Sequence, residues 1–106
     1  MSDSPGYDPR RSARLPVEIM ALVDQPRAQR RAQAELAELS REGCRLMVDE
    51  AFEPGAQLLI LVPGHEPWPA RVIWVAEGGM GVEFHTPLPA AVVADYGLRF
   101  QRGEGA

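Results

Sequence analysis

Turn signals that contain proline or glycine recur at short intervals along this chain. They lie at Pro54-Gly55, Pro63-Gly64, Gly78-Gly79 and Pro87, and the residues between them are rich in β-branched and aromatic side chains. Such intervals leave no room for long helices, whereas strands of about five residues fit between the turns. The spacing therefore predicts a mainly β fold, either a small antiparallel barrel or a sandwich.

Alternating apolar residues place the individual strands. Leu15, Val17, Ile19 and Ala21 recur at period two, which is typical of a half-buried strand. Further strands are expected over residues 44–48, 57–62, 68–76 and 82–85, with a glycine turn at 78–81. A short helix is expected within residues 88–96, and Gly97 is expected to end it.

The segment from Arg27 to Leu39 is rich in strong helix formers. Its apolar residues recur at spacings of three and four: Ala28, Ala32, Leu36 and Leu39. Local propensity alone therefore predicts a helix here, although tertiary context can override such a preference.

The composition is that of a single globular domain. The chain has 106 residues, 45% of them hydrophobic, which suffices for one packed core and leaves little room for a second. The first residues contain no apolar secretion signal, and the longest apolar run, residues 58–62, is far too short to span a bilayer. We therefore expect a cytoplasmic protein that does not insert into membranes.

Few residues suit catalysis or metal binding. The single cysteine, Cys44, permits no intrachain disulfide and is expected to be a small buried residue. His65 and His85 fit no metal-ligand spacing, so we expect surface histidines and no metal site. Because no nucleophile is paired with a recognisable base, we expect no enzymatic activity.

All eleven basic residues are arginine, and three of them lie close together at Arg10, Arg11 and Arg14. The net charge of −4 argues against a long nucleic acid as partner, and it favours core packing over base stacking for Trp68 and Trp74. A solvated basic loop is the common interpretation of such an arginine cluster. The alternative is a grip on an anionic ligand, because the guanidinium fork binds phosphate through two hydrogen bonds.

A second polar segment, Glu38 to Gly43, precedes an apolar strand. Taken with the arginines, it resembles the PilZ family, whose members carry RxxxR near the start and [D/N]xSxxG further on. Arg10 to Arg14 matches the first motif, and Ser40 and Gly43 match the second, while Glu38 stands where aspartate or asparagine is usual. The strand–turn–strand stretch over residues 70–84 is also similar, and the resemblance covers about residues 8–100.

The resemblance implies a six-stranded antiparallel β-barrel with a short C-terminal helix. It therefore implies a strand around Leu36, against the local propensity. The domain would span residues 8–100, with an arginine-rich arm over 8–14 and flexible tails at 1–7 and 101–106.

The resemblance also implies a function, since many PilZ domains bind the bacterial second messenger cyclic di-GMP. The expected ligand-binding residues are Arg10, Arg11, Arg14, Glu38, Ser40 and Gly43, with no cofactor. Arginine can pair with phosphate or with guanine O6 and N7, and a carboxylate at position 38 can accept from the guanine edge. The chain would then be a stand-alone receptor that relays the signal to an unidentified protein partner, as a monomer or a dimer. Because Glu38 departs from the motif, a degenerate PilZ domain that serves as a protein–protein module is the alternative.

Overall fold

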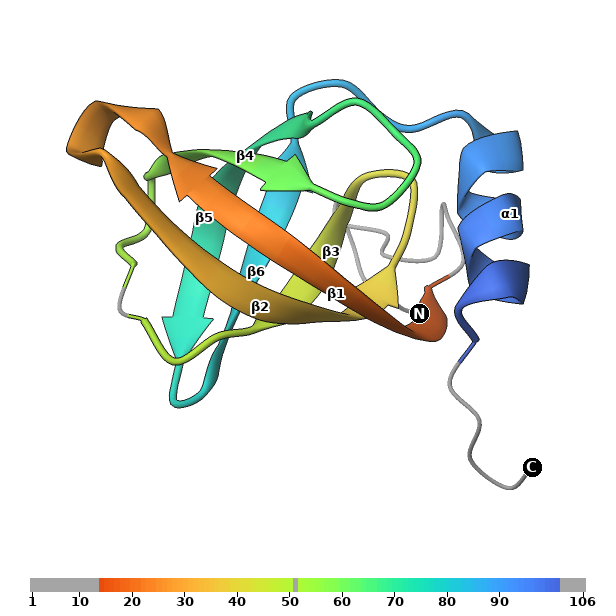
Figure 1. Cartoon of the computed structure of the whole chain (residues 1–106), viewed down its shortest axis with the longest axis horizontal. Coiled ribbons are helices and arrows are strands. Elements are labelled where there is room, and N and C mark those ends of the chain that lie inside the picture. The colour runs from red at the N-terminus through yellow and green to blue at the C-terminus, as the bar shows by residue number, and fades with distance from the viewer. Residues whose placement is uncertain (1–13, 51, 102–106) are drawn as a thin grey trace, which may run out of the picture.

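In the computed structural model, the chain forms a closed antiparallel β-barrel of six strands with one helix (Figure 1). The structure describes residues 14–50 and 52–101. Around the barrel the strand order is β1-β2-β3-β6-β5-β4. The elements are β1 (Leu15–Gln25), η2 (Pro26–Ala28), β2 (Arg30–Leu39), β3 (Gly43–Met47), β4 (Gln57–Leu61), β5 (Trp68–Ala76), β6 (Gly79–Phe84) and α1 (Ala90–Arg99). The expected fold is confirmed.

The segment with helical propensity is the strand β2. Its small apolar residues alternate with polar ones, so that Ala32, Ala34 and Leu36 are buried while the residues between them face outward. The strand pairs along its length with β1 and at its end with β3. Pairing on two sides and burial of one face outweigh an intrinsic preference of less than about 1 kcal/mol per residue.

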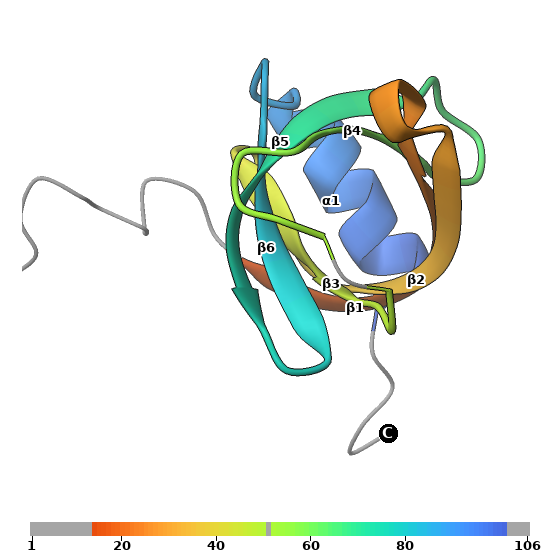
Figure 2. The same cartoon turned by 90° about the vertical axis from the view of Figure 1, so that its left-hand side faces the viewer.

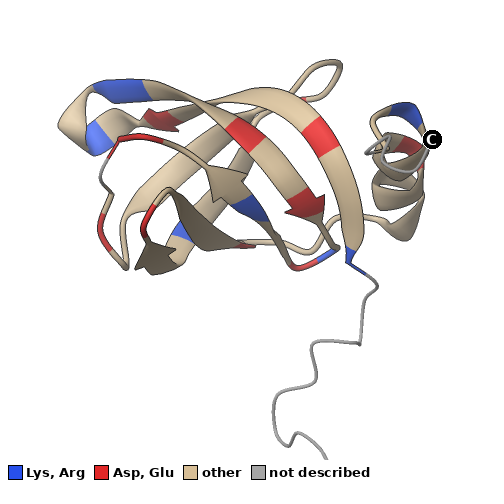
Figure 3. Cartoon of the chain, turned by 90° about the horizontal axis from the view of Figure 1, so that it is seen from below, with Lys and Arg blue, Asp and Glu red and all other residues tan. Residues whose placement is uncertain are grey.

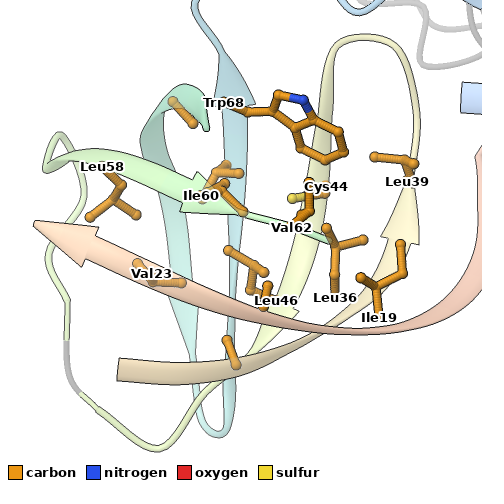
Figure 4. Packing of buried hydrophobic residues seen from close by; sticks show 14 of the residues in the cluster. Ile19, Val23, Leu36, Leu39, Cys44, Leu46, Leu58, Ile60, Val62 and Trp68 are labelled. Atoms are coloured by element: carbon orange, nitrogen blue, oxygen red, sulfur yellow. The ribbon is translucent and has the colours of Figure 1, made fainter. Parts of the chain in front are cut away.

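The inward-facing side chains fill the barrel. Every strand contributes to one buried cluster, part of which Figure 4 shows at close range. Its labelled members are Ile19, Val23, Leu36, Leu39, Cys44, Leu46, Leu58, Ile60, Val62 and Trp68. Cys44 is buried as expected, and this burial raises the pKa of its thiol. The thiol therefore stays protonated and unreactive at neutral pH.

The helix α1 lies across one end of the barrel, as the view down the barrel in Figure 2 shows. Its buried Tyr96 packs edge-on against the indole of Trp68, with 5.5 Å between the ring centroids, and its hydroxyl donates a hydrogen bond to the carbonyl of Pro63. Phe84 packs against the same indole at 5.4 Å. These rings close the barrel end. Within the described ranges, no helix has the length and apolar character to cross a membrane.

The helix continues past Gly97, where the sequence analysis ended it. A Cβ at Gly97 would overlap the side chain of Leu15 at the start of β1. The glycine therefore allows the helix to pack closely on the barrel and does not terminate it. Beyond the helix, Gln101 forms an isolated bridge with Val17, and the amide of Glu18 donates to the carbonyl of Phe100 at 2.8 Å.

The turn between β5 and β6 is shorter than the expected glycine turn at 78–81. It consists of Glu77 and Gly78 alone, because Ala76 already pairs with Gly79. Gly78 has a φ of +80°, which glycine adopts without strain. The remaining glycines of the run belong to strand β6.

Candidate functional site

A groove of about 740 Å³ lies on the outer wall of the barrel, over strands β2, β3, β6 and β5. It is lined by polar and aromatic side chains rather than by core residues alone. The residues used in the argument below are Arg14, Glu38, Ser40, Gly43, Arg45, Arg71, Trp74, Gly81 and Glu83. A groove of this size accommodates a drug-sized or dinucleotide-sized molecule.

A bulge in β2 turns Glu38 toward this groove. Leu36 pairs with Leu46 and Glu38 pairs with the adjacent Arg45 of β3. The residue between them on β2, Ala37, therefore has no partner on β3. Without the bulge, the alternation of buried residues at 32, 34 and 36 would place residue 38 in the core. The bulge shifts the alternation by one, which buries Leu39 and leaves Glu38 outside.

A second bulge, in β5, turns Trp74 outward in the same way. Val72 pairs with Val82 and Trp74 pairs with Gly81, so Ile73 is the extra residue. Trp74 is 43% exposed, whereas unbroken alternation from the buried Val72 would point it into the barrel. A Cβ at Gly81 would overlap the indole, so the ring lies directly over this glycine.

The strand register arranges the groove residues in two rows. One row runs across the four strands from Glu38 through Arg45 and Gly81 to Trp74. The next row contains Gly43, Glu83 and Arg71, which are direct partners on β3, β6 and β5. Carboxylates, guanidinium groups and one flat ring thus share a single wall.

Ser40 and Gly43 form the tight turn between β2 and β3. The amide of Ser40 donates to the carbonyl of Gly43 at 2.9 Å, and the Gly43 amide donates to the Ser40 hydroxyl oxygen at 3.3 Å. The hydroxyl also lies 3.2 Å from the Gly43 carbonyl oxygen. Both motif residues therefore have a structural function in the turn in addition to lining the groove.

The residue at position 43 must be glycine because the backbone of strand β6 lies very close to it. A Cβ at this position would overlap the carbonyl oxygen of Val82 on β6. The close approach that this glycine permits is therefore that of the β6 backbone.

Arg14 meets the second motif at the mouth of the groove. Its guanidinium lies 4.0 Å from the Glu38 carboxylate, and both side chains are partly exposed. A long, exposed pair of this kind contributes little to stability, so a ligand can replace it. Arg10 and Arg11, the other expected contacts, lie outside the described residues, as do the proposed tail at 1–7 and most of that at 101–106.

The sequence analysis missed Trp74, Arg45 and Arg71. It assigned both tryptophans to the core, which is correct for Trp68 and wrong for Trp74. The position of Trp74 could have been inferred from the two-residue turn at 77–78. Continuing the strand pairing outward from this turn places Trp74 opposite Gly81. A glycine opposite an aromatic residue leaves room for the ring on the outer face.

Both histidines lie at the surface, as the sequence analysis expected. His65 and His85 are both exposed. No group of three potential metal ligands comes together within residues 14–50 and 52–101. Charges of both signs are spread over the barrel strands, as Figure 3 shows.

The chain is thus a closed six-stranded barrel with a mixed-charge groove on its outer wall. The model of the PilZ domain family matches residues 8–102, so the chain belongs to the PilZ family. PilZ domains are cyclic di-GMP-binding domains rather than catalysts. No curated protein matches the chain.

Proposed function

We propose that this protein is a bacterial cyclic di-GMP receptor that works without catalysis and passes the signal to a protein partner. The observation that supports the proposal is that two segments far apart in the sequence meet at one groove. Arg14 directly precedes β1, and the segment from Glu38 to Gly43 runs from the end of β2 through the turn to the start of β3. Nothing in the barrel core requires an arginine and a carboxylate to meet there.

The groove chemistry suits a dinucleotide with two phosphates and two guanines. Arg14, together with Arg10 and Arg11 just before it, would bind phosphate and the guanine O6 and N7 acceptors. Glu38 would accept hydrogen bonds from the N1–H and N2–H₂ edge of guanine. The extra methylene of glutamate, compared with the usual aspartate, weakens this contact because it moves the oxygens by about one bond length.

Trp74 supplies the stacking surface for one base. The indole lies over Gly81 and is 43% exposed, so part of its surface is open to a purine. We expect Trp74→Ala to lower the affinity for cyclic di-GMP about tenfold, since base–aromatic stacking contributes about 1–3 kcal/mol. Trp74→Phe should keep most of the affinity. Titration calorimetry on both variants measures this difference, with exposed Met20→Ala on β1 as the control; equal affinities for all three variants would refute the stacking role.

The alternative, a degenerate domain that acts only as a protein–protein module, is favoured by one observation. Glu38 lies near Arg14, so the carboxylate can neutralise the arginine that would hold phosphate. This alternative expects no nucleotide binding by the natural chain and recovery of binding by Glu38→Asp, which restores the usual motif residue.

Calorimetric titration of the full chain with cyclic di-GMP separates the two proposals. The receptor proposal expects saturable heat in the micromolar range. Absence of heat at high micromolar ligand, with heat restored by Glu38→Asp, would favour the degenerate module instead.

A further inference from the structure

We propose that Arg71 and Glu83 form a second guanine-reading subsite, which sets the preference for guanine over adenine. The inference rests on the proposed cyclic di-GMP binding and extends it to two residues that lie outside both sequence motifs. It assigns the base on the β5–β6 side of the groove to this pair.

The pair is held in place by the sheet register. Arg71 and Glu83 are direct cross-strand partners on β5 and β6, and both line the groove. The guanidinium Nη2 donates to the Glu83 Oε1 at 3.0 Å, and the two side chains are 50% and 54% exposed. A donor fork and a carboxylate are therefore presented side by side with their outer surfaces open to solvent.

The pair also lies beside the stacking ring. Trp74 covers Gly81, and Gly81 precedes Glu83 by two residues on β6. Two residues along a strand span about 7 Å. A purine stacked on the indole therefore directs one of its edges toward the Arg71–Glu83 pair.

The chemistry of the pair selects guanine. The Glu83 carboxylate can accept from N1–H and N2–H₂, while Arg71 can donate to O6 or to a phosphate. Adenine presents an N1 lone pair where guanine has a donor, and an amine where guanine has O6. Glu83 would then face the N1 lone pair and Arg71 the amine, and neither can form the hydrogen bond that it forms with guanine.

Glu38 cannot perform the same task for the same base. It lies on β2, two strand spacings from Glu83 on β6, which is roughly 10 Å. Each carboxylate therefore needs its own base, as a dinucleotide with two guanines provides.

The direction in which a charge-neutralising substitution changes the ligand affinity distinguishes this role from that of a surface ion pair. If the pair is only structural, Glu83→Gln removes a negative charge near an anionic ligand and should leave the affinity unchanged or raise it. If Glu83 reads guanine, the same change lowers the affinity for cyclic di-GMP, by about tenfold for a lost charged base contact. Asp95→Asn is the matched control, because Asp95 pairs with Arg99 at 2.9 Å with nearly equal exposure but lies on α1, outside the groove lining.

The test is calorimetric titration of the full-length chain and both variants with cyclic di-GMP and with cyclic GMP–AMP, in which one guanine is replaced by adenine. We expect the natural chain to bind cyclic di-GMP more tightly, and Glu83→Gln to lose affinity and to narrow the difference between the two ligands. Glu83→Gln binding like Asp95→Asn would overturn the subsite alone. Failure of the natural chain to bind cyclic di-GMP would overturn the proposed function and this inference with it.

Discussion

Replacing Arg14 with alanine should lower the affinity for cyclic di-GMP about 30-fold, which corresponds to a loss of about 2 kcal/mol. Arg14 lies at the mouth of the groove and its described ion pair, with Glu38, is long and partly exposed. Its side chain is 53% exposed, and a charge-assisted contact with phosphate contributes more than a neutral hydrogen bond. Titration calorimetry measures the change directly.

Arg31→Ala is the control for this prediction. Arg31 is likewise an exposed arginine in a loose ion pair, 3.6 Å from Asp24, but it does not line the groove. Its replacement lowers the net charge as much as Arg14→Ala does. A similar loss of affinity in both variants would show that the arginines act only through overall charge.

Gly43→Ala should destabilise the fold by about 3 kcal/mol, at the upper end for an overpacked position. The new methyl group would overlap the backbone carbonyl of Val82, which cannot rotate away as a side chain would. The β3–β6 pairing and the groove floor must shift to relieve the overlap. For a domain of this size, the melting temperature should fall by roughly 10–20 °C in calorimetry or circular dichroism.

Gly79→Ala on the same pair of strands provides the comparison. A Cβ there would lie 3.2 Å from the carbonyl oxygen of Leu46, an approach that a small adjustment relieves. We expect a loss of about 1 kcal/mol or less, as for glycine replacements without severe overlap. Equal melting temperatures for the two variants would contradict the account of the β3–β6 contact.

The strands were predictable because their buried faces alternate in the sequence. Even β2, with its helical composition, has Ala32, Ala34 and Leu36 at period two, and this pattern competes with the helical spacing of Ala28, Ala32 and Leu36. Propensity favoured the helix, and pairing with β1 and β3 decided for the strand. Gly97 misled the placement of the helix end because its close contact is with Leu15, which is distant in sequence.

The bulge in β5 explains why Trp74 escaped prediction. An extra residue such as Ala37 or Ile73 has no side-chain signature, since it is defined by pairing with a neighbouring strand. Each bulge reverses the facing of the next residue, and these are the residues, Glu38 and Trp74, that give the groove its carboxylate and its ring. Glu38 stands in a motif, whereas Trp74 is marked only by its pairing with Gly81 across the two-residue turn.

The motif residues divide into two kinds once their contacts are known. Ser40 and Gly43 hold the β2–β3 turn whether or not a ligand is present, through their mutual hydrogen bonds and the close approach of β6. The Arg14 side chain is 53% exposed and Trp74 is 43% exposed, and both lie outside the buried core. Substitutions at the arginine and the tryptophan therefore report on binding, while those at the turn report mainly on folding.

The most direct test of the groove as the binding site is an amide NMR titration of the full chain with cyclic di-GMP. We expect saturable shifts at the backbone amides of Ser40 and Gly43, at Gly81 and at the indole N–H of Trp74, with α1 unaffected. No shifts at millimolar ligand, or shifts confined to residues outside the groove, would contradict the account.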